Sequence, residues 1–192
     1  MTTLILVVGG AVSLSFLCSI LEAVLLSISY SYVSLMRDRG GRAGEWLHRM
    51  QERIDEPIAA ILTLNTIANT LGATFGGALA LRVLGNEWIA VFSGGLTLTI
   101  LLVSEIVPKT LGATYWQQLA RPATYVLMVL VFVMKPLLVP LRAFARLITP
   151  TSERPSTVTR EELEVLAHMG WHAGTIDEDE FQVVRNVIRL DE

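Results

Sequence analysis

The longest apolar stretch of the sequence runs from Leu4 to Met36 and contains a single charged residue, Glu22. About 20 residues of helix cross the hydrocarbon core of a bilayer, so this stretch predicts one long helix that spans the membrane and projects beyond it. Of the 192 residues, 52% are hydrophobic and only 17% are charged, a balance that soluble domains rarely show. We therefore expect an all-α integral membrane protein.

Two further apolar stretches predict two more spans, one from Pro57 to about Leu81 and one from Trp88 to about Ser104. The loop between the first two stretches carries Arg37, Arg39, Arg42, Arg49 and Arg53. The positive-inside rule places this loop in the cytoplasm and the N-terminus outside. The N-terminus lacks the basic leader of a signal peptide and should stay attached as an anchor. We expect a multi-pass protein of the cell membrane.

Residues 119–148 are open to two interpretations. Their apolar run from Pro122 to Met134 has 13 residues, fewer than the roughly 17 that a crossing requires. We interpret residues 119–148 as a broken pair of helices that lies in or along the cytoplasmic interface, so that three helices span the membrane. The alternative is a fourth, kinked span, which would place the C-terminal tail outside.

The C-terminal tail differs in charge from the rest of the chain. Residues 159–192 hold nine of the 18 acidic residues and only three arginines. We expect a transmembrane domain over residues 1–148, a linker over 149–158 and a small acidic helical bundle in the cytoplasm over 159–192. In this bundle Thr159 opens one helix and Asp177 caps the next. A role in nucleic-acid binding is not expected, because the chain has no basic stripe to neutralise phosphates.

The third span ends in ionisable residues. Glu105 and Lys109 follow an apolar run, and an ionisable group inside a membrane costs about 3 kcal/mol or more, so it usually has a function. Pro108 lacks an N–H, which leaves the carbonyl of Ser104 without its usual helical partner. A carboxylate and a free carbonyl are the oxygen ligands that Mg²⁺ prefers. The alternative is an ion pair between Glu105 and Lys109, four residues apart.

The second span carries Asn65, Asn69, Gly72 and Gly76 at the spacing of one helix face. Amides inside a membrane face protein or water, and small residues allow helices to approach closely. The stripe can therefore hold helices together, or it can line a cation site. The sequence leaves both interpretations open, and the neighbouring Glu105 favours the cation site.

The first span contributes hydroxyl groups and one carboxylate. Ser15, Ser19 and Glu22 share one face, and Ser27 belongs to a second face. Most serines in membrane helices only bond their own helix backbone. Glu22 differs, because a buried carboxylate needs a proton or a partner, such as a hydroxyl group or a coupling ion.

Catalytic motifs are not found in this sequence. It contains no HExxH, GxSxG, P-loop or dinucleotide fingerprint, and we do not expect an enzyme. Cys18 is the only cysteine, which leaves no intrachain disulfide.

Three segments together resemble the CNNM/CorC family of magnesium transporters, through the membrane module known as the DUF21 domain. They are Ser19-Ile20-Leu21-Glu22-Ala23, Leu64-Asn65-Thr66-Ile67-Ala68-Asn69 and Ser104-Glu105-Ile106-Val107-Pro108-Lys109. The resemblance covers nearly the whole chain. It implies a homodimer with three spans per subunit, a juxtamembrane helical belt and a Mg²⁺ site open to the cytoplasm. It also implies export of Mg²⁺ coupled to Na⁺ entry, and a CBS module, C-terminal to the acidic bundle, that binds nucleotide.

The resemblance also assigns roles to residues. The implied Mg²⁺ ligands are Ser19, Asn65, Asn69 and Glu105, with backbone carbonyls near Gly72 and Ser104. Apart from the resemblance, we assign roles in coupling or gating to Glu22, Ser27, Pro108 and Lys109. The alternative function is a membrane-anchored Mg²⁺ sensor or regulatory subunit that binds the ion without transporting it.

Overall fold

The computed structural model describes residues 1–38, 42–148 and 160–188, with side chains described outside 141–162. It divides into two compact units, Met1–Leu147 and Ile148–Glu192. Every regular element in the described residues is a helix, and four helices are long and apolar enough to cross a membrane. The predicted fold class, an all-α membrane protein, is confirmed. The predicted linker, residues 149–158, lies outside the described residues.

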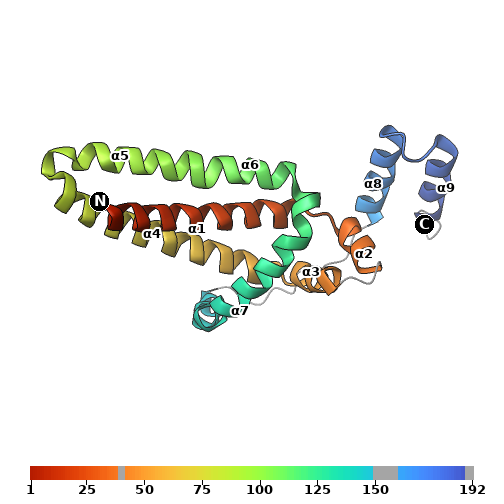
Figure 1. Ribbon diagram of the computed structural model, residues 1–192. Helices are drawn as coiled ribbons and strands as arrows, with labels where there is room; N and C mark the ends of the chain where they lie inside the picture. The colour runs from red at the N-terminus through yellow and green to blue at the C-terminus, as the bar shows by residue number, and fades with distance from the viewer. Residues whose placement is uncertain (39–41, 149–159, 189–192) are drawn as a thin grey trace. The chain divides into compact units, whose positions relative to one another are not determined.

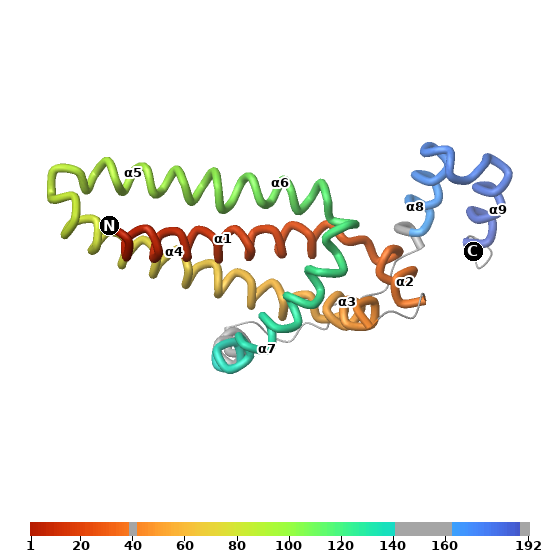
Figure 2. Tube along the Cα trace, viewed as in Figure 1, coloured from red at the N-terminus to blue at the C-terminus, as the bar shows by residue number. Residues whose placement is uncertain are grey.

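Three long rods make up most of the first unit and run side by side (Figures 1 and 2). The first is α1 (Thr2–Ser27), and the second is α4 (Asp55–Leu84). The third is built from α5 (Ile89–Thr99), the π-helix η2 (Ile100–Ile106) and α6 (Val107–Thr114). Helix α1 packs against α4, η2 and α6. The short 3₁₀ turn η1 (Asn86–Trp88) joins α4 to α5, and Gly85 before it has φ +83°, which favours glycine.

The prediction of one helix from Leu4 to Met36 is wrong. Helix α1 ends at Ser27, Ile28 is extended, and a separate helix α2 (Tyr30–Asp38) follows. The buried side chain of Gln51, in α3 (Arg42–Glu52), donates from Nε2 to the carbonyl of Ile28 at 3.1 Å. This bond satisfies a carbonyl that a continuous helix would have paired with its own backbone. At the same break the N–H of Tyr32 donates to Ser29 Oγ at 3.3 Å, so a local bond and a residue more than 20 positions away both satisfy the backbone there.

The prediction that residues 119–148 form two separate helices is also wrong, whereas their predicted position along the cytoplasmic interface stays a prediction. Helix α7 (Trp116–Ile148) is continuous and contains Pro122, Pro136 and Pro140. Because the helix continues through its prolines, Trp116–Pro140 is 25 residues long and meets the length and hydropathy of a span. Figure 1 shows that α7 runs obliquely to the three rods, whereas they run alongside one another. Four helices thus have the length to cross, one more than predicted.

The hydrophobic core lies where α7 meets the arginine-rich end of the rods. Leu21, Val24 and Leu25 of α1 belong to the same buried cluster as Leu47 of α3 and Leu127 of α7. These residues come from helices far apart in the sequence. Their burial fixes the helices α2 and α3, which follow the break, against the ends of the membrane-spanning rods.

The second unit consists of α8 (Arg160–His172) and α9 (Glu178–Ile188). Asp177 accepts a bond at Oδ1 from the N–H of Glu180 at 2.7 Å, and Glu180 Oε2 accepts one from the N–H of Asp177 at 2.9 Å. This reciprocal pair is a capping box and confirms Asp177 as a helix cap. Trp171 stacks on Phe181 with ring centroids 5.3 Å apart, which joins the two helices. The cap predicted at Thr159 lies outside the described residues.

Close packing of α6 on α1 predicts a strong effect of a small substitution. A Cβ atom at Gly112 would lie 2.8 Å from Ala23 Cβ and 2.9 Å from the backbone oxygen of Ile20. We expect Gly112→Ala to destabilise the protein by about 1–3 kcal/mol, the usual cost of overpacking, measured by thermal unfolding in detergent. Gly94→Ala is the matched control, because nothing lies within 4 Å of a Cβ there. Equal melting temperatures for the two variants would contradict this close packing of α6 on α1.

Candidate cation site

Polar side chains join α1 to α4 inside the bundle. Ser15 Oγ is fully buried and donates to Asn65 Oδ1 at 2.7 Å, and Asn69 Nδ2 donates to the same oxygen at 3.4 Å. Asn65 therefore faces a neighbouring helix, as an amide in a membrane should, and Asn69 bonds to Asn65 within α4. Ser15, which the family resemblance does not include among the ligands, is the residue that makes the contact. The sequence indicated this role of Ser15 only by placing it on the same helix face as Ser19.

Two oxygen atoms near this contact are buried without a partner. Within the described residues, neither Ser19 Oγ nor Asn69 Oδ1 has a hydrogen bond. Ser19 lies one helical turn after Ser15, and Asn69 lies one turn after Asn65. Because α1 and α4 run antiparallel, with Gly72 against Ala11, the two oxygens lie on opposite sides of the Ser15–Asn65 contact. An unsatisfied buried polar group costs about 1–3 kcal/mol, so each one requires an explanation. Both are neutral oxygen donors of the kind that hard cations accept as ligands.

Gly72 and Gly76 continue this face of α4 and allow it to approach α1. A Cβ atom at Gly72 would lie 2.4 Å from Ala11 Cβ, and one at Gly76 would lie 3.0 Å from Val8 Cγ2. Any larger residue would force the helices apart. The structure therefore supports close packing at both glycines, as the first interpretation of the stripe predicted.

The ion pair between Glu105 and Lys109, one of the alternatives that the sequence left open, does not form. Lys109 Nζ lies 3.2 Å from Glu22 Oε2, so the lysine pairs with the first helix and not with Glu105 in its own helix. The Glu22 side chain is 17% exposed. Apart from this ion pair, its Oε2 has no hydrogen-bond partner among the described residues. Gly112 lies one turn beyond Lys109 and contacts Ile20 and Ala23. This close contact places α6 near enough to α1 for the lysine to reach Glu22.

Glu105 lies in a widened helical turn. The π-helix η2 includes both Ser104 and Glu105, and the N–H of Val107 donates to the carbonyl of Leu102, five residues back. Single π-turns within α-helices occur often at functional sites. The sequence indicated a backbone irregularity here through Pro108, which is buried, but it did not predict the π-turn.

The predicted site residues are only partly brought together. Ser104 is fully buried, but its hydroxyl donates to the carbonyl of Ile100 at 2.8 Å, the ordinary role of a serine in a helix. Glu105 is partly exposed and forms no ion pair with any residue that the structure describes. Ser27 is the last residue of α1, beyond Glu22. The described residues contain no cluster of three or more His, Cys, Asp or Glu side chains, so a metal ion bound among them would need neutral oxygens.

Comparison with known proteins decides the family. The family model of the cyclin M transmembrane N-terminal domain matches residues 1–180. The chain belongs to the CNNM family. Its membership, together with the membrane-spanning helices, makes it a multi-pass membrane protein.

Individual relatives agree with this assignment. A UPF0053 protein of Synechocystis is 33% identical over 178 residues, which cover 93% of this chain and 51% of the relative. The UPF0053 inner membrane protein YfjD of Escherichia coli is 27% identical over 153 residues, covering 77% of this chain and 36% of the relative. A chloroplastic DUF21 domain-containing protein of Arabidopsis thaliana is 23% identical over 137 residues, which are 69% of this chain and 21% of the relative. The chain thus spans about half the length, or less, of these relatives.

The pairing of Glu22 with Lys109 predicts non-additive effects on stability. Lys109→Met alone should destabilise the protein by about 1–2 kcal/mol, because a mostly buried carboxylate loses its counter-ion. This is less than the roughly 3–5 kcal/mol for a fully buried pair, since the Lys109 side chain is 47% exposed. The double variant Glu22→Gln/Lys109→Met should recover most of the loss. Thermal unfolding of the four proteins measures the coupling, and additive losses would show that the two groups do not interact.

Proposed function

We propose that this chain is the membrane domain of a magnesium transporter, which binds dehydrated Mg²⁺ between its helices. The observation that supports it most directly is that α1 and α4, which pack on each other, each carry a buried oxygen without a partner, Ser19 Oγ and Asn69 Oδ1, one on either side of the Ser15–Asn65 contact. A folded protein leaves such atoms unsatisfied at a cost, and a cation bound by either atom would remove part of that cost. Membership of the CNNM family supports the same cargo.

The proposed ligands combine one carboxylate with neutral oxygens. They are Ser19, Asn65, Asn69 and Glu105, together with backbone carbonyls near Gly72 and Ser104. Mg²⁺ requires near-octahedral coordination and loses its water reluctantly, so the ligands have to be held in a small, rigid space. A single carboxylate keeps the ion bound weakly enough to leave, as transport requires.

Binding would require a local movement of the third rod. Glu105 does not pair with α1 or α4 in the described residues, whereas η2 packs directly against α1. The π-turn, followed by Pro108, interrupts the regular helical bonding at this point. We propose that this turn lets Glu105 swing toward α1, while sliding at Gly72 and Gly76 alternates access between the two sides.

Direction and coupling form the second part of the proposal. The arginine-rich end of the bundle is assigned to the cytoplasm by the positive-inside rule, with the N-terminus outside. Mg²⁺ would enter from the cytoplasm and leave outward, driven by Na⁺ entry. Glu22 would receive the coupling ion in competition with Lys109, and Ser27 and Pro108 would take part in gating. The working unit would be a homodimer, with a nucleotide-binding CBS module following this chain.

Flux measurements test the proposed site. In proteoliposomes containing the purified protein, Glu105→Gln and Asn69→Ala should each lower Mg²⁺ flux by about tenfold or more, the usual scale for loss of a group that holds a metal. Glu87→Gln is the matched control, because Glu87 is exposed in η1 at the far end of the rods. A Na⁺ gradient should be needed for the wild-type flux. Unchanged flux in both site variants, with the proteins folded, would refute the proposal.

A second measurement separates transport from sensing. Mg²⁺ should raise the melting temperature of the wild-type protein but not that of Glu105→Gln. Thermal protection without flux would support the alternative of a membrane-anchored Mg²⁺ sensor. If Mg²⁺ gives neither thermal protection nor flux, the proposed cation site is refuted.

A further inference from the structure

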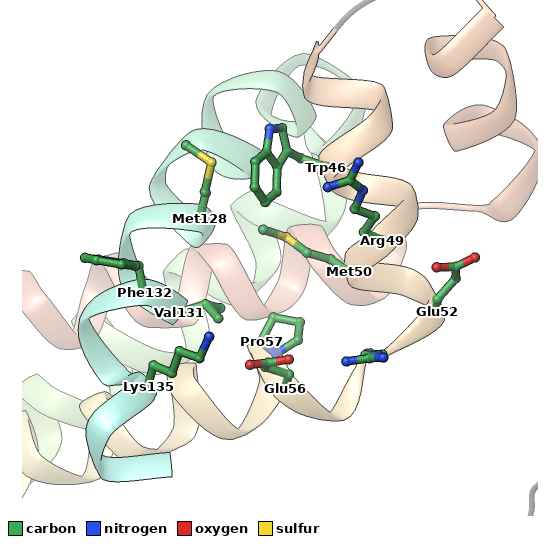
Figure 3. Close-up of a pocket in the computed structure, with 11 residues that line it drawn as sticks. Trp46, Arg49, Met50, Glu52, Glu56, Pro57, Met128, Val131, Phe132 and Lys135 are labelled. Carbon is green, nitrogen blue, oxygen red and sulfur yellow. The ribbon is translucent and has the colours of Figure 1, made fainter. Parts of the chain in front are cut away.

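A cavity of about 560 Å³ lies away from the candidate cation site, between α3, the start of α4 and the middle of α7 (Figure 3). This volume is within the range of pockets that hold small molecules. Glu56 and Pro57 in its lining belong to the first turn of a membrane-spanning helix. The cavity therefore lies near the boundary between the hydrocarbon core and water.

Two amphipathic stripes face each other across the cavity. On α3, Trp46, Arg49 and Met50 have the spacing i, i+3 and i+4 of one helix face, and Arg53 lies in the turn that directly follows the helix. The second stripe, on α7, consists of Met128, Val131, Phe132 and Lys135, with the spacing i, i+3, i+4 and i+7. Apolar side chains and arginines alternate on the α3 side, whereas the α7 stripe is apolar until it ends in Lys135. Figure 3 shows Trp46 and Met128 at one end of the cavity and Lys135 beside Glu56 and Pro57 at the other.

Several of the charges that line the cavity already have partners. Arg49 pairs with Glu45 on α3 and lies over the ring of Trp46. Glu52 Oε1 lies 3.5 Å from His48 Nε2, and Glu56 is also engaged in an interaction. Arg53 and Lys135 form no ion pair with any residue that the structure describes. Two cations are thus left in the lining to receive an anionic group.

We propose that this cavity binds an anionic phospholipid. The phosphodiester lies between Arg53 and Lys135, where the guanidinium group offers the paired donors that suit a phosphate. The acyl chains follow the apolar stripe of α7 and leave past Phe132, whose side chain is 78% exposed. A basic pocket between membrane helices, at the interface, is the general form of an anionic lipid site. A soluble anion would gain nothing from the apolar stripe.

The test compares lipids on the purified chain in detergent. Binding of phosphatidylglycerol and phosphatidylcholine is measured by native mass spectrometry, with glycerol phosphate as a probe that has the anionic group without acyl chains. We expect the wild-type protein to prefer phosphatidylglycerol and to bind glycerol phosphate weakly. Arg53→Gln/Lys135→Gln should reduce the affinity for phosphatidylglycerol by about 25-fold, which is about fivefold for each cation near the membrane surface. Arg121→Gln, on the same helix but outside the cavity, should leave it unchanged.

A second measurement tests whether the lipid lies in the cavity, because the variants could also lower lipid binding by disturbing the fold. Brominated phosphatidylglycerol should quench tryptophan fluorescence more in the wild-type protein than in Trp46→Phe, because Trp46 lines the cavity. Arg53→Lys/Lys135→Arg keeps both charges and should retain binding. Equal affinity for both lipids, or equal loss in the Arg121→Gln control, would overturn the proposal. Tight binding of glycerol phosphate would assign the cavity to a soluble anion instead.

Discussion

The close contact of α1 with its two neighbouring rods is the constraint on which the rest of the structure depends. On one side Gly72 lets α4 meet Ala11, and on the other Gly112 lets α6 meet Ile20 and Ala23. In a bilayer, helices associate through such close packing and not through a hydrophobic driving force. These contacts bring Ser15 within bonding distance of Asn65 and Lys109 within reach of Glu22. The polar groups of the bundle are thus positioned by the small residues.

The bundle contains polar groups that do not stabilise it. Ser19 Oγ and Asn69 Oδ1 are buried without partners in the described residues, and Glu22 relies on one half-exposed lysine. A helix pair held only by apolar packing would avoid these costs. Among the described residues, three of the four buried side-chain atoms without a hydrogen bond lie on α1 and α4, and the fourth, Gln51 Oε1, lies on α3. This distribution is what a site that exchanges protein contacts for contacts with a cation would need.

The arginine-rich end of the rods has a different organisation. There α2, α3 and α7 pack around the ends of α1 and α4, and the buried cluster that includes Leu25, Leu47 and Leu127 joins all of them. Trp46, Phe132 and the charged residues beside them face outward from this core. This end therefore combines a rigid apolar centre with an amphipathic rim, which suits helices that lie where the membrane meets water.

The sequence by itself determined the fold class, the three rods and the residue types of the candidate site, because hydropathy, helix periodicity and proline position are local properties. It also determined the cap at Asp177, which involves residues three positions apart. Only the tertiary structure decided that the distant Gln51 satisfies the carbonyl of Ile28 just after the end of α1, because the N–H of Tyr32, its partner in a continuous helix, bonds to Ser29 instead. It also decided that Lys109 pairs with Glu22 and not with Glu105. Both contacts join residues from parts of the chain far apart in sequence. The distance between such partners is set by helix packing, which no single segment encodes.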